Sequence, residues 1–369
     1  MQIFIKKLNI FLIPLYIFLV LFGFFYLCGC YGGEIGTIDN IIKKQRDNKT
    51  ALFGMGYNEQ NAYYKLVNVN YYKADVITLG TSRVMQFQSN EFKVPFYNTG
   101  GGVWFNYDQY LAFLKKLEYR PKVVILGLDL WCFNEAWIKN NEINRRTDDF
   151  SIIKRSAFVI IKTMIKDYFN SKWEIKNLKN YKDNFGFNGI IKNSGFKNDG
   201  SYYHGDIYQN PKGANDYEFR DTFKRISDGN SRFEYGKDIH TETVDKLDKL
   251  LKWCKEENIR VVGFLAPLAP SIYKKMLDTG KYEYMLKIAP ACELVFDKYS
   301  FTFVDCLDGG KVFDLDDAYI DGFHGGEIVY AIILKKLAEQ DIQLGDMINK
   351  EYIEVMIENK YNNLLFQKP

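Results

Sequence analysis

Two segments of the chain carry side chains suited to acyl transfer. Ser82 follows the apolar segment 74–80, and a sharp exit from a strand there would present its hydroxyl as a nucleophile. A helix N-cap is the alternative role for a serine at this place. Asp321 and His324 are three residues apart in a short Asp-Gly-Phe-His segment, so the imidazole could take the serine proton while the carboxylate orients the ring. A purely structural role is the alternative for this histidine.

A glycine run, Gly100-Gly101-Gly102, follows the extended segment 94–98. Small residues let the backbone N–H groups of such a run point at an anion or at the oxyanion that develops during acyl transfer. A flexible turn before the next helix is the alternative. The run therefore marks a second group of atoms that could serve the same reaction as Ser82.

These segments follow strands of a predicted α/β sheet. The expected strands are 74–80, 94–98, 123–129, 259–265 and 301–305, and the expected helices are 107–117, 241–254, 282–299 and 325–337. Strands that alternate with helices favour a mostly parallel sheet covered on both faces. Ligands bind beyond the carboxyl ends of parallel strands, so the residues that follow each strand are the candidates for a site.

The N-terminal 33 residues predict a membrane anchor. Residues 8 to 33 carry no charge, and residues 10 to 30 would span about 31 Å as a helix, which matches the hydrocarbon core of a bilayer. This stretch is longer than the apolar region of a signal peptide, which favours an uncleaved helix. Lys6 and Lys7 favour a cytoplasmic N-terminus, hence a single-pass protein of the cell membrane whose soluble part is extracytoplasmic. A lipoprotein with Cys30 as the lipidated residue is the alternative.

The rest of the chain is expected to form one core with an insertion. We expect a linker at 34–73, the first half of the core at 74–134, an insertion or cap subdomain at 135–240, the second half of the core at 241–340, and a tail at 341–369. The alternation of strands and helices stops in the insertion. This division keeps Ser82 in one half of the core and His324 in the other.

Composition and motifs exclude several classes of function. The net charge of +3 is too balanced for a nucleic-acid partner. The chain has no nucleotide phosphate loop and no His or Cys pair at metal-ligand spacing, so no cofactor and no metal are expected. The four cysteines beyond the anchor are expected to be buried thiols, with one disulfide as the alternative.

The ordered set of segments resembles the SGNH hydrolase (GDSL-like) superfamily over about residues 74 to 338, insertion excluded. In that family a Ser follows the first strand, a Gly the second and an Asn the third, and an Asp-x-x-His lies near the end. The matching positions are Ser82, Gly100 or Gly101, Asp129, and Asp321 with His324. The resemblance implies a three-layer α/β/α sandwich with a mostly parallel, flavodoxin-like sheet.

The resemblance also implies a role for each matching residue. Ser82 would be acylated, His324 would act as general base and then as general acid, and Asp321 would orient the imidazole. The backbone N–H groups of Ser82 and of Gly100 or Gly101 would stabilise the oxyanion.

The third matching position departs from the family pattern. Asp129 places a carboxylate where an asparagine amide would donate, and an ionised carboxylate repels an oxyanion. Asp129 is therefore expected to be protonated, to be turned away, or to reflect an altered chemistry. Asn134, five positions later, is a candidate replacement donor. A strand-end residue that caps a neighbouring backbone is the alternative role for Asp129.

With the anchor, the chain resembles membrane-tethered proteins that act in O-acylation of cell-surface polymers, such as alginate O-acetyltransferases and D-alanyl-lipoteichoic acid transfer proteins. We therefore expect a Ser-dependent acyl esterase or O-acyltransferase that acts on a cell-surface polysaccharide or glycolipid. A membrane-bound O-acyltransferase that relays the acyl group is an expected partner. The alternative is a non-catalytic accessory or binding protein of such a system. Aromatic residues near the segments could stack on a sugar or pack in the core: Trp104, Phe105, Trp131 and Phe133.

Overall fold

The computed structural model describes residues 1–102, 106–141, 150–152, 155–214 and 216–358. The chain divides into two compact units. The first unit contains residues 1–60, 152–198 and 203–205, and the second contains residues 61–151, 199–202 and 206–369. The segment 135–240 contributes residues to both units.

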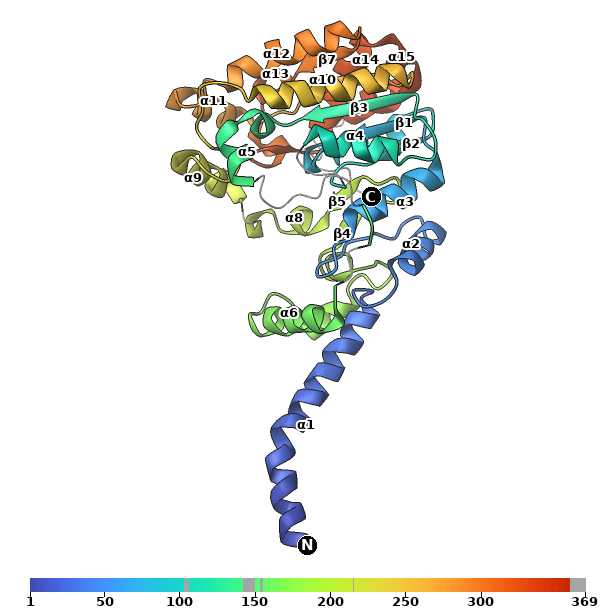
Figure 1. Cartoon of the computed structure of the whole chain (residues 1–369), viewed down its shortest axis with the longest axis vertical. Helices are drawn as coiled ribbons and strands as arrows, with labels where there is room; N and C mark the ends of the chain where they lie inside the picture. Colours follow the sequence, from blue (N-terminus) through green and yellow to red (C-terminus); the bar gives the residue numbers. More distant parts are fainter. Residues whose placement is uncertain (103–105, 142–149, 153–154, 215, 359–369) are drawn as a thin grey trace. The chain divides into compact units, whose positions relative to one another are not determined.

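A five-stranded parallel sheet forms the centre of the second unit (Figure 1). Its strands are β1 (Val76–Leu79), β2 (Phe96–Asn98), β3 (Val123–Leu128), β6 (Arg260–Leu265) and β7 (Thr302–Asp305), in the order β2-β1-β3-β6-β7. Each strand lies within a stretch expected to be a strand, so the expected α/β class is confirmed. The register places Thr78 beside Asn98, and Leu79 beside Leu126. The carboxyl ends of β1, β2 and β3 therefore lie at one edge of the sheet.

The central strands form because their sequences are apolar without interruption. Every residue of β1 (VITL) and of β3 (VVILGL) is buried. Continuous apolar runs with β-branched residues are typical of strands covered on both faces, where an alternating pattern would place polar side chains in the core.

Four long helices of the second unit occur where the sequence predicts them: α4 (Tyr107–Lys115), α10 (Thr241–Glu256), α12 (Met285–Lys298) and α14 (Glu327–Gln340). α10 contacts α4 and α12, and α14 contacts α15 (Ile342–Met347) and α16 (Lys350–Glu358). α10 is amphipathic and buries Leu247, Leu250, Leu251 and Cys254 on one face.

The remaining elements of the second unit are shorter. The helices are α3 (Asn61–Tyr72), α5 (Glu135–Asn141), α8 (Gly205–Gln209), α9 (Arg220–Asp228), α11 (Pro270–Thr279) and α13 (Gly309–Val312). The 3₁₀ helices are η1 (Ser82–Val84), η2 (Ser89–Glu91), η3 (Leu130–Phe133), η6 (Pro211–Gly213), η7 (Tyr217–Phe219) and η8 (Asp316–Ala318). An antiparallel hairpin joins β8 (Tyr319–Asp321) to β9 (His324–Gly325).

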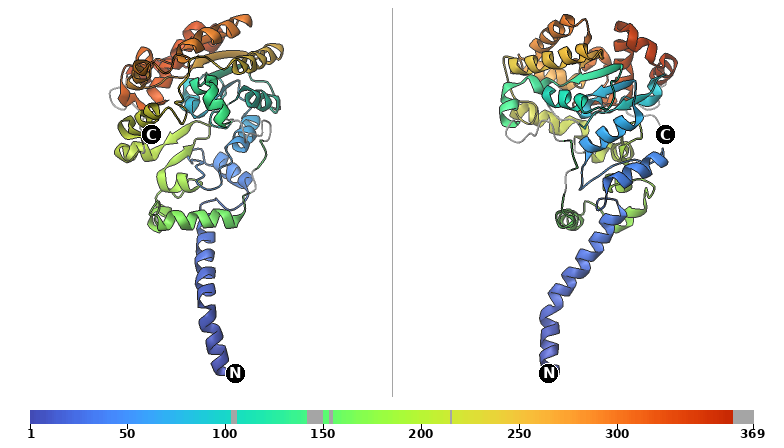
Figure 2. Two further views of the ribbon diagram at one scale, coloured as in Figure 1. Left: turned by 60° about the vertical axis from the view of Figure 1, so that its left-hand side comes forward. Right: turned by 45° about the vertical axis from the view of Figure 1, so that its right-hand side comes forward.

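The first unit begins with α1 (Gln2–Tyr31), which is long and apolar enough to cross a membrane. Its other elements are α2 (Ile38–Asp47), α6 (Ala157–Phe169), η5 (Ile175–Lys179), α7 (Phe187–Lys192) and β4 (Ser194–Phe196), which pairs with β5 (Tyr202–His204). In Figures 1 and 2, α6 runs across the C-terminal end of α1.

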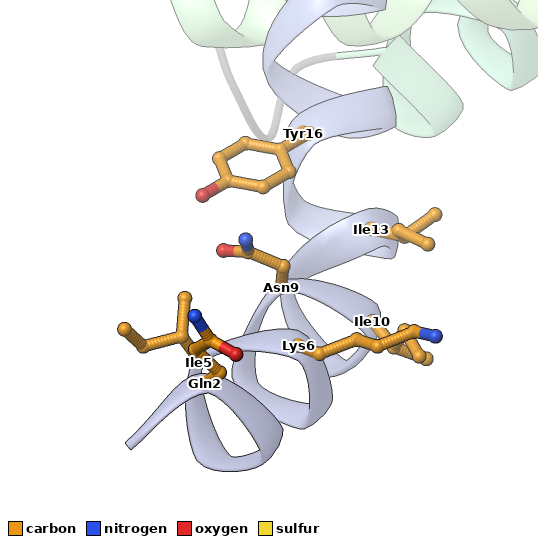
Figure 3. Close-up of a pocket in the computed structure, with 7 residues that line it drawn as sticks. All are labelled: Gln2, Ile5, Lys6, Asn9, Ile10, Ile13 and Tyr16. Atoms are coloured by element: carbon orange, nitrogen blue, oxygen red, sulfur yellow. The ribbon is translucent and has the colours of Figure 1, made fainter.

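The N-terminal turns of α1 are exposed. Figure 3 shows seven of their side chains along a hollow on the helix surface: Gln2, Ile5, Lys6, Asn9, Ile10, Ile13 and Tyr16. One helix alone lines this hollow, so it lacks the enclosing walls that a ligand site needs. Polar side chains at this end suit the headgroup region at which a membrane helix ends.

All six cysteines are free thiols, and the four beyond the anchor are buried. Burial raises the pKa of Cys254 and of Cys306 to about 12, which keeps both side chains protonated. The expectation of buried thiols is therefore confirmed, and the disulfide alternative is excluded.

Candidate active site

Ser82 is the first residue of η1, directly after the turn that ends β1. Thr81 caps this short helix, because its hydroxyl accepts the N–H of Arg83 at 3.3 Å. The Ser82 hydroxyl instead lies 2.8 Å from Nε2 of His324. The N-cap alternative for Ser82 is therefore wrong, and its hydroxyl faces an imidazole from the other half of the sheet unit.

The β8–β9 hairpin holds Asp321 and His324 together. The Asp321 Oδ1 accepts the backbone N–H groups of Phe323 and His324 at 2.9 and 2.8 Å, and Oδ2 lies 2.7 Å from the His324 Nδ1. The carboxylate thus closes the hairpin and fixes the ring at the same time. This double use explains why an aspartate three positions before the histidine suits a tight loop.

Electrostatics favour the ionised form of Asp321. Burial alone would raise the pKa of this carboxyl, but His324 and the hydrogen bonds to Oδ1 and Oδ2 hold the pKa below its ordinary value. An ionised Asp321 accepts a proton-bearing Nδ1, which leaves the Nε2 lone pair free to accept the Ser82 hydroxyl proton. Ser82, His324 and Asp321 therefore have the geometry of a nucleophile, a base and a carboxylate that orients the base.

Asp216 supports the loop between Asp321 and His324. Its Oδ2 accepts the N–H of Gly322 at 3.1 Å and the hydroxyl of Thr222 at 2.6 Å. A Cβ on Gly322 would lie 2.4 Å from Thr222 Cγ2, so only glycine fits there. The hairpin that carries the imidazole is thus held from its outer side.

Asp129 follows β3 and is 3% exposed. Its Oδ2 accepts the Thr81 hydroxyl at 2.6 Å, and its Oδ1 lies 3.2 Å from the Arg83 Nη1. Burial raises the pKa of Asp129, and Arg83 and Thr81 offset part of that rise. Both carboxylate oxygens thus hold the two neighbours of Ser82. The structure thus turns both oxygens of Asp129 toward Thr81 and Arg83, which is one of the arrangements expected for a carboxylate at this position.

The expected glycine donors are committed to other acceptors. The Gly100 N–H donates to Asn98 Oδ1 at 2.8 Å, and the Gly101 N–H donates to the Gly80 carbonyl at 3.3 Å. Asn98, at the end of β2, also donates through Nδ2 to the Val84 and Phe87 carbonyls at 2.8 and 2.9 Å. The glycine run therefore fastens the end of β2 to the segment that carries Ser82.

Val84 explains why glycines occur at the ends of three strands. A Cβ would lie 2.8 Å from Val84 Cγ1 at Gly80, 2.5 Å from Cγ2 at Gly100, and 2.2 Å from Cγ1 at Gly127. Because real Cβ atoms do not approach this closely, the isopropyl group needs all three glycines. The Val84 side chain, called the Val84 plug below, thus packs against the carboxyl ends of β1, β2 and β3 and fixes the turn two residues after Ser82.

Asn134 holds the start of α5. Its Nδ2 donates to the Glu234 carbonyl at 2.7 Å, and its Oδ1 accepts the Trp137 N–H at 3.1 Å. Since the amide is 1% exposed and both of its ends are bonded, the structure gives it no contact with Ser82. The structure does not bring Asn134 and Ser82 together, and the role of Asn134 as a replacement oxyanion donor stays a prediction.

One amide near the nucleophile is available. Within the part of the chain that the structure describes, the N–H of Ser82 donates to no acceptor. A backbone N–H at the first turn of a helix lacks an intrahelical partner. The N–H of Ser82 could therefore donate to the oxyanion that develops when the Ser82 hydroxyl is acylated.

Arginine and aromatic side chains border the hairpin. The Arg83 and Arg232 guanidinium groups lie 5.1 and 5.2 Å from the Trp131 ring centroid, and Arg232 lies 5.6 Å from Phe323. Burial lowers the pKa of Arg232, whereas Asp129 and Asp321 raise it. Positive charge near these carboxylates keeps the site from being strongly anionic.

The aromatic residues that were candidates for sugar stacking have different outcomes. Trp131 and Phe133 are 1% and 0% exposed, so they pack in the core. Trp104 and Phe105 lie outside the described residues.

Sequence reasoning missed several residues that build this site. Thr81 and Arg83 are adjacent to Ser82, and a polar pair on both sides of a candidate nucleophile was a usable signal. Asn98 ends a buried strand with a polar residue, which was another. Arg232 had no such signal. It lies in the expected insertion, where the sequence shows no alternation of strands and helices that would place a residue relative to the sheet.

Among the described residues, no three His, Cys, Asp or Glu side chains gather as a metal site would require. The chain matches no protein-family model, no curated protein and no solved structure.

Proposed function

We propose that this chain is a membrane-anchored, Ser-dependent acyl esterase or O-acyltransferase of the SGNH hydrolase type. The proposal is supported by the strand order β2-β1-β3-β6-β7. When the five strands of this sheet are counted along the chain, the order is 2-1-3-4-5, which is the flavodoxin-like order of doubly wound folds. The groups α4–α10–α12 and α14–α15–α16 would be the outer layers of a three-layer α/β/α sandwich. Ser82 follows the strand from which the family's nucleophile comes.

The Ser82–His324–Asp321 relay is the observation that carries the proposal. The Ser82 Oγ would attack an ester carbonyl while its proton moves to the His324 Nε2, 2.8 Å away. The imidazolium would then protonate the departing alcohol, which leaves an acyl-Ser82 ester. Water or a sugar hydroxyl, deprotonated by His324, would attack that ester and release Ser82. Hydrolysis and transfer use the same residues and differ only in the acceptor.

The substrate class follows from the place of action. α1 would keep the catalytic unit at a membrane, with Lys6 and Lys7 on the cytoplasmic side and the sheet unit outside the cytoplasm. An ester-bearing surface polysaccharide or glycolipid is the substrate that such a tether would present. A membrane-bound O-acyltransferase would supply the acyl group if the reaction is a transfer.

A fluorophosphonate probe tests the proposal, because it modifies a serine only when a base activates it. We expect labelling of the full chain in detergent, loss of labelling in Ser82→Ala, and unchanged labelling in Ser227→Ala. Ser227 is exposed on α9 and its hydroxyl bonds the Phe223 carbonyl, which makes it a matched control. A folded wild-type chain that the probe leaves unmodified would overturn the enzymatic proposal.

The second candidate function is a non-catalytic accessory or binding protein of a surface-polymer acylation system. The observation that favours it is the engagement of the Gly100, Gly101 and Asn134 donors inside the protein. Co-sedimentation of the unlabelled, folded chain with a surface polysaccharide would support this role. Equal sedimentation with an unrelated polymer would count against it.

A further inference from the structure

We propose that α6 lies in the membrane interface and inserts one flank, centred on Phe158 and Phe169, among the lipids next to α1. The inference concerns the first unit alone and rests on α1 crossing the membrane. It does not depend on catalysis by Ser82. The occupant of this flank is a phospholipid bilayer, recognised by apolar side chains bordered by lysines.

The uncharged part of α1 sets the position of the bilayer along the helix. Residues 3 to 21 are exposed apart from Leu12, whereas Phe25 and Cys28 are buried by the first unit. Lys6 and Lys7 mark the headgroup region at the N-terminal end of α1, and about 20 residues counted from Leu8 span the roughly 30 Å of the hydrocarbon core, which brings its other boundary to about residue 27. The hydrocarbon would therefore end where α6 crosses α1 (Figure 2).

α6 has two apolar sides, and only one of them is covered. Ile160, Ile161 and Met164 are buried and pack in one cluster with Phe25 of α1. Phe158 and Phe169 are 57% and 66% exposed. These two phenylalanines are eleven residues apart, which returns to nearly the same side of a helix after three turns. They form an uncovered apolar flank along the helix.

Ring contacts show which way this flank points. The Phe158 ring stacks on Phe22 with centroids 6.0 Å apart, while Tyr168 meets Phe25 edge-on at 5.5 Å. Phe22 precedes Phe25 by about 4.5 Å along the axis of α1, on the side of the exposed apolar stretch. Phe158 therefore lies on the side of α6 that faces the hydrocarbon, and Phe169 shares that side.

Charged residues border the flank as an interfacial helix requires. Lys162 and Lys166 are exposed and follow Phe158 around the helix by about 40° and 80°. Their stems can lie along the apolar edge while the ammonium groups reach lipid phosphates. Thr163 and Asp167 lie on the opposite flank, and Asp167 pairs with Lys172 at 2.8 Å. The flank of Phe158 and Phe169 is therefore suited to lipid, and the flank of Thr163 and Asp167 is suited to water.

Spin-label accessibility tests the proposal on the full chain in phosphatidylethanolamine and phosphatidylglycerol vesicles. Nitroxides are placed by Phe158→Cys, Phe169→Cys and, as the matched control, Thr163→Cys. Each is made in a Cys30→Ser background, because Cys30 is exposed and the five other cysteines are buried. Phe169 is 66% exposed and its ring meets Tyr168 of the same helix, so Phe169→Cys guards against a folding defect at Phe158.

We expect oxygen to relax the labels at positions 158 and 169 more strongly than a water-soluble nickel chelate does, and the reverse at position 163. Access of the nickel chelate to positions 158 and 169 equal to that at position 163 would place the flank in water and overturn the proposal. Exclusion of both reagents from these positions would mean that protein covers the flank, which also overturns it.

Two controls separate this proposal from its premise and from the proposed function. Alkaline carbonate extraction tests α1 directly: release of the full chain from vesicles would remove the premise, whereas retention leaves the label pattern as the test of α6. Fluorophosphonate labelling of Ser82 reports on catalysis alone. A lipid-buried flank in an unlabelled protein would therefore retain this inference and reject the enzymatic one.

Discussion

The Asp129 carboxylate and the Arg83 guanidinium form an ion pair at 3.2 Å whose two side chains are 2% and 1% exposed. Arg83 also donates to the Pro267 carbonyl, and Asp129 accepts the Thr81 hydroxyl. The pair thus ties both neighbours of Ser82 to the end of β3. A carboxylate at this position is compatible with an oxyanion because a fixed guanidinium compensates its charge.

Removing one member of this pair should destabilise the protein strongly. Asp129→Asn keeps the shape and the contact with Thr81 but leaves a buried, unpaired guanidinium. We expect the free energy of unfolding to fall by about 3–5 kcal/mol. Urea unfolding of the full chain in detergent, followed by tryptophan fluorescence, measures the change.

Two further variants test whether burial of the charge is the cause. Glu135→Gln breaks an exposed pair with Lys139 on α5 and should lower the free energy of unfolding far less than Asp129→Asn does, because solvent screens the exposed pair. Asp129→Leu combined with Arg83→Met should recover most of the loss, because it leaves no buried charge. Equal costs for Asp129→Asn and Glu135→Gln would show that the buried pair contributes no more than a surface pair.

His324 and Asp321 should act on Ser82 as a unit. We expect Asp321→Asn to slow fluorophosphonate labelling by about 10⁴-fold, since the imidazole loses its orienting acceptor. His324→Gln should slow it at least as much. The double variant should be no slower than His324→Gln alone, because an acid that acts through the histidine has no effect without it. His240→Gln, which alters a histidine bonded to Thr243, should label at the wild-type rate. Additive losses in the double variant would contradict the relay.

Asp321 should also contribute to the acid sensitivity of the fold. Its pKa is below the ordinary value in the folded state, so its contribution to stability is present above about pH 4 and is lost as the pH falls through the folded pKa. Asp321→Asn should therefore lose less stability than the wild type between about pH 5 and about pH 3. The urea midpoint at each pH gives the comparison. Asp297→Asn, at an exposed position of α12, should follow the wild-type profile. If the urea midpoint of Asp321→Asn fell with pH as steeply as that of the wild type, Asp321 would not contribute to the acid sensitivity of the fold.

The sheet and the serine–histidine pair could be predicted from the sequence for the same physical reason. Apolar runs such as VITL and VVILGL specify buried parallel strands, and parallel strands bring their carboxyl ends to one edge. The Asp-x-x-His segment is local, so its hydrogen bonds follow from a tight hairpin. Ser82 and His324 are 242 positions apart in the sequence. The sheet and the hairpin together bring them into contact, and both could be predicted from local sequence patterns.

The supporting contacts could not be predicted because they depend on packing between distant residues. Arg83 meets Asp129 across 46 positions, and Arg232 approaches Trp131 from a segment without recognisable periodicity. The glycine run fits an oxyanion site by composition alone. Only the close approach of Val84 reveals that Gly100 is needed for packing.

The Val84 plug should couple strand packing to the reactivity of Ser82. In Gly127→Ala the new Cβ would meet Val84 Cγ1 at 2.2 Å, so η1 has to shift and the serine leaves its place beside His324. We expect a loss of about 1–3 kcal/mol in the free energy of unfolding together with slower fluorophosphonate labelling. Gly263→Ala is the matched control, because its Cβ would meet Phe296 Cζ at the same 2.2 Å in β6, away from η1. It should cost similar stability and leave the labelling rate unchanged. Adding Val84→Ala to Gly127→Ala removes the clashing methyl groups and should restore part of the stability. Equal labelling in the two glycine variants would show that Val84 does not position Ser82.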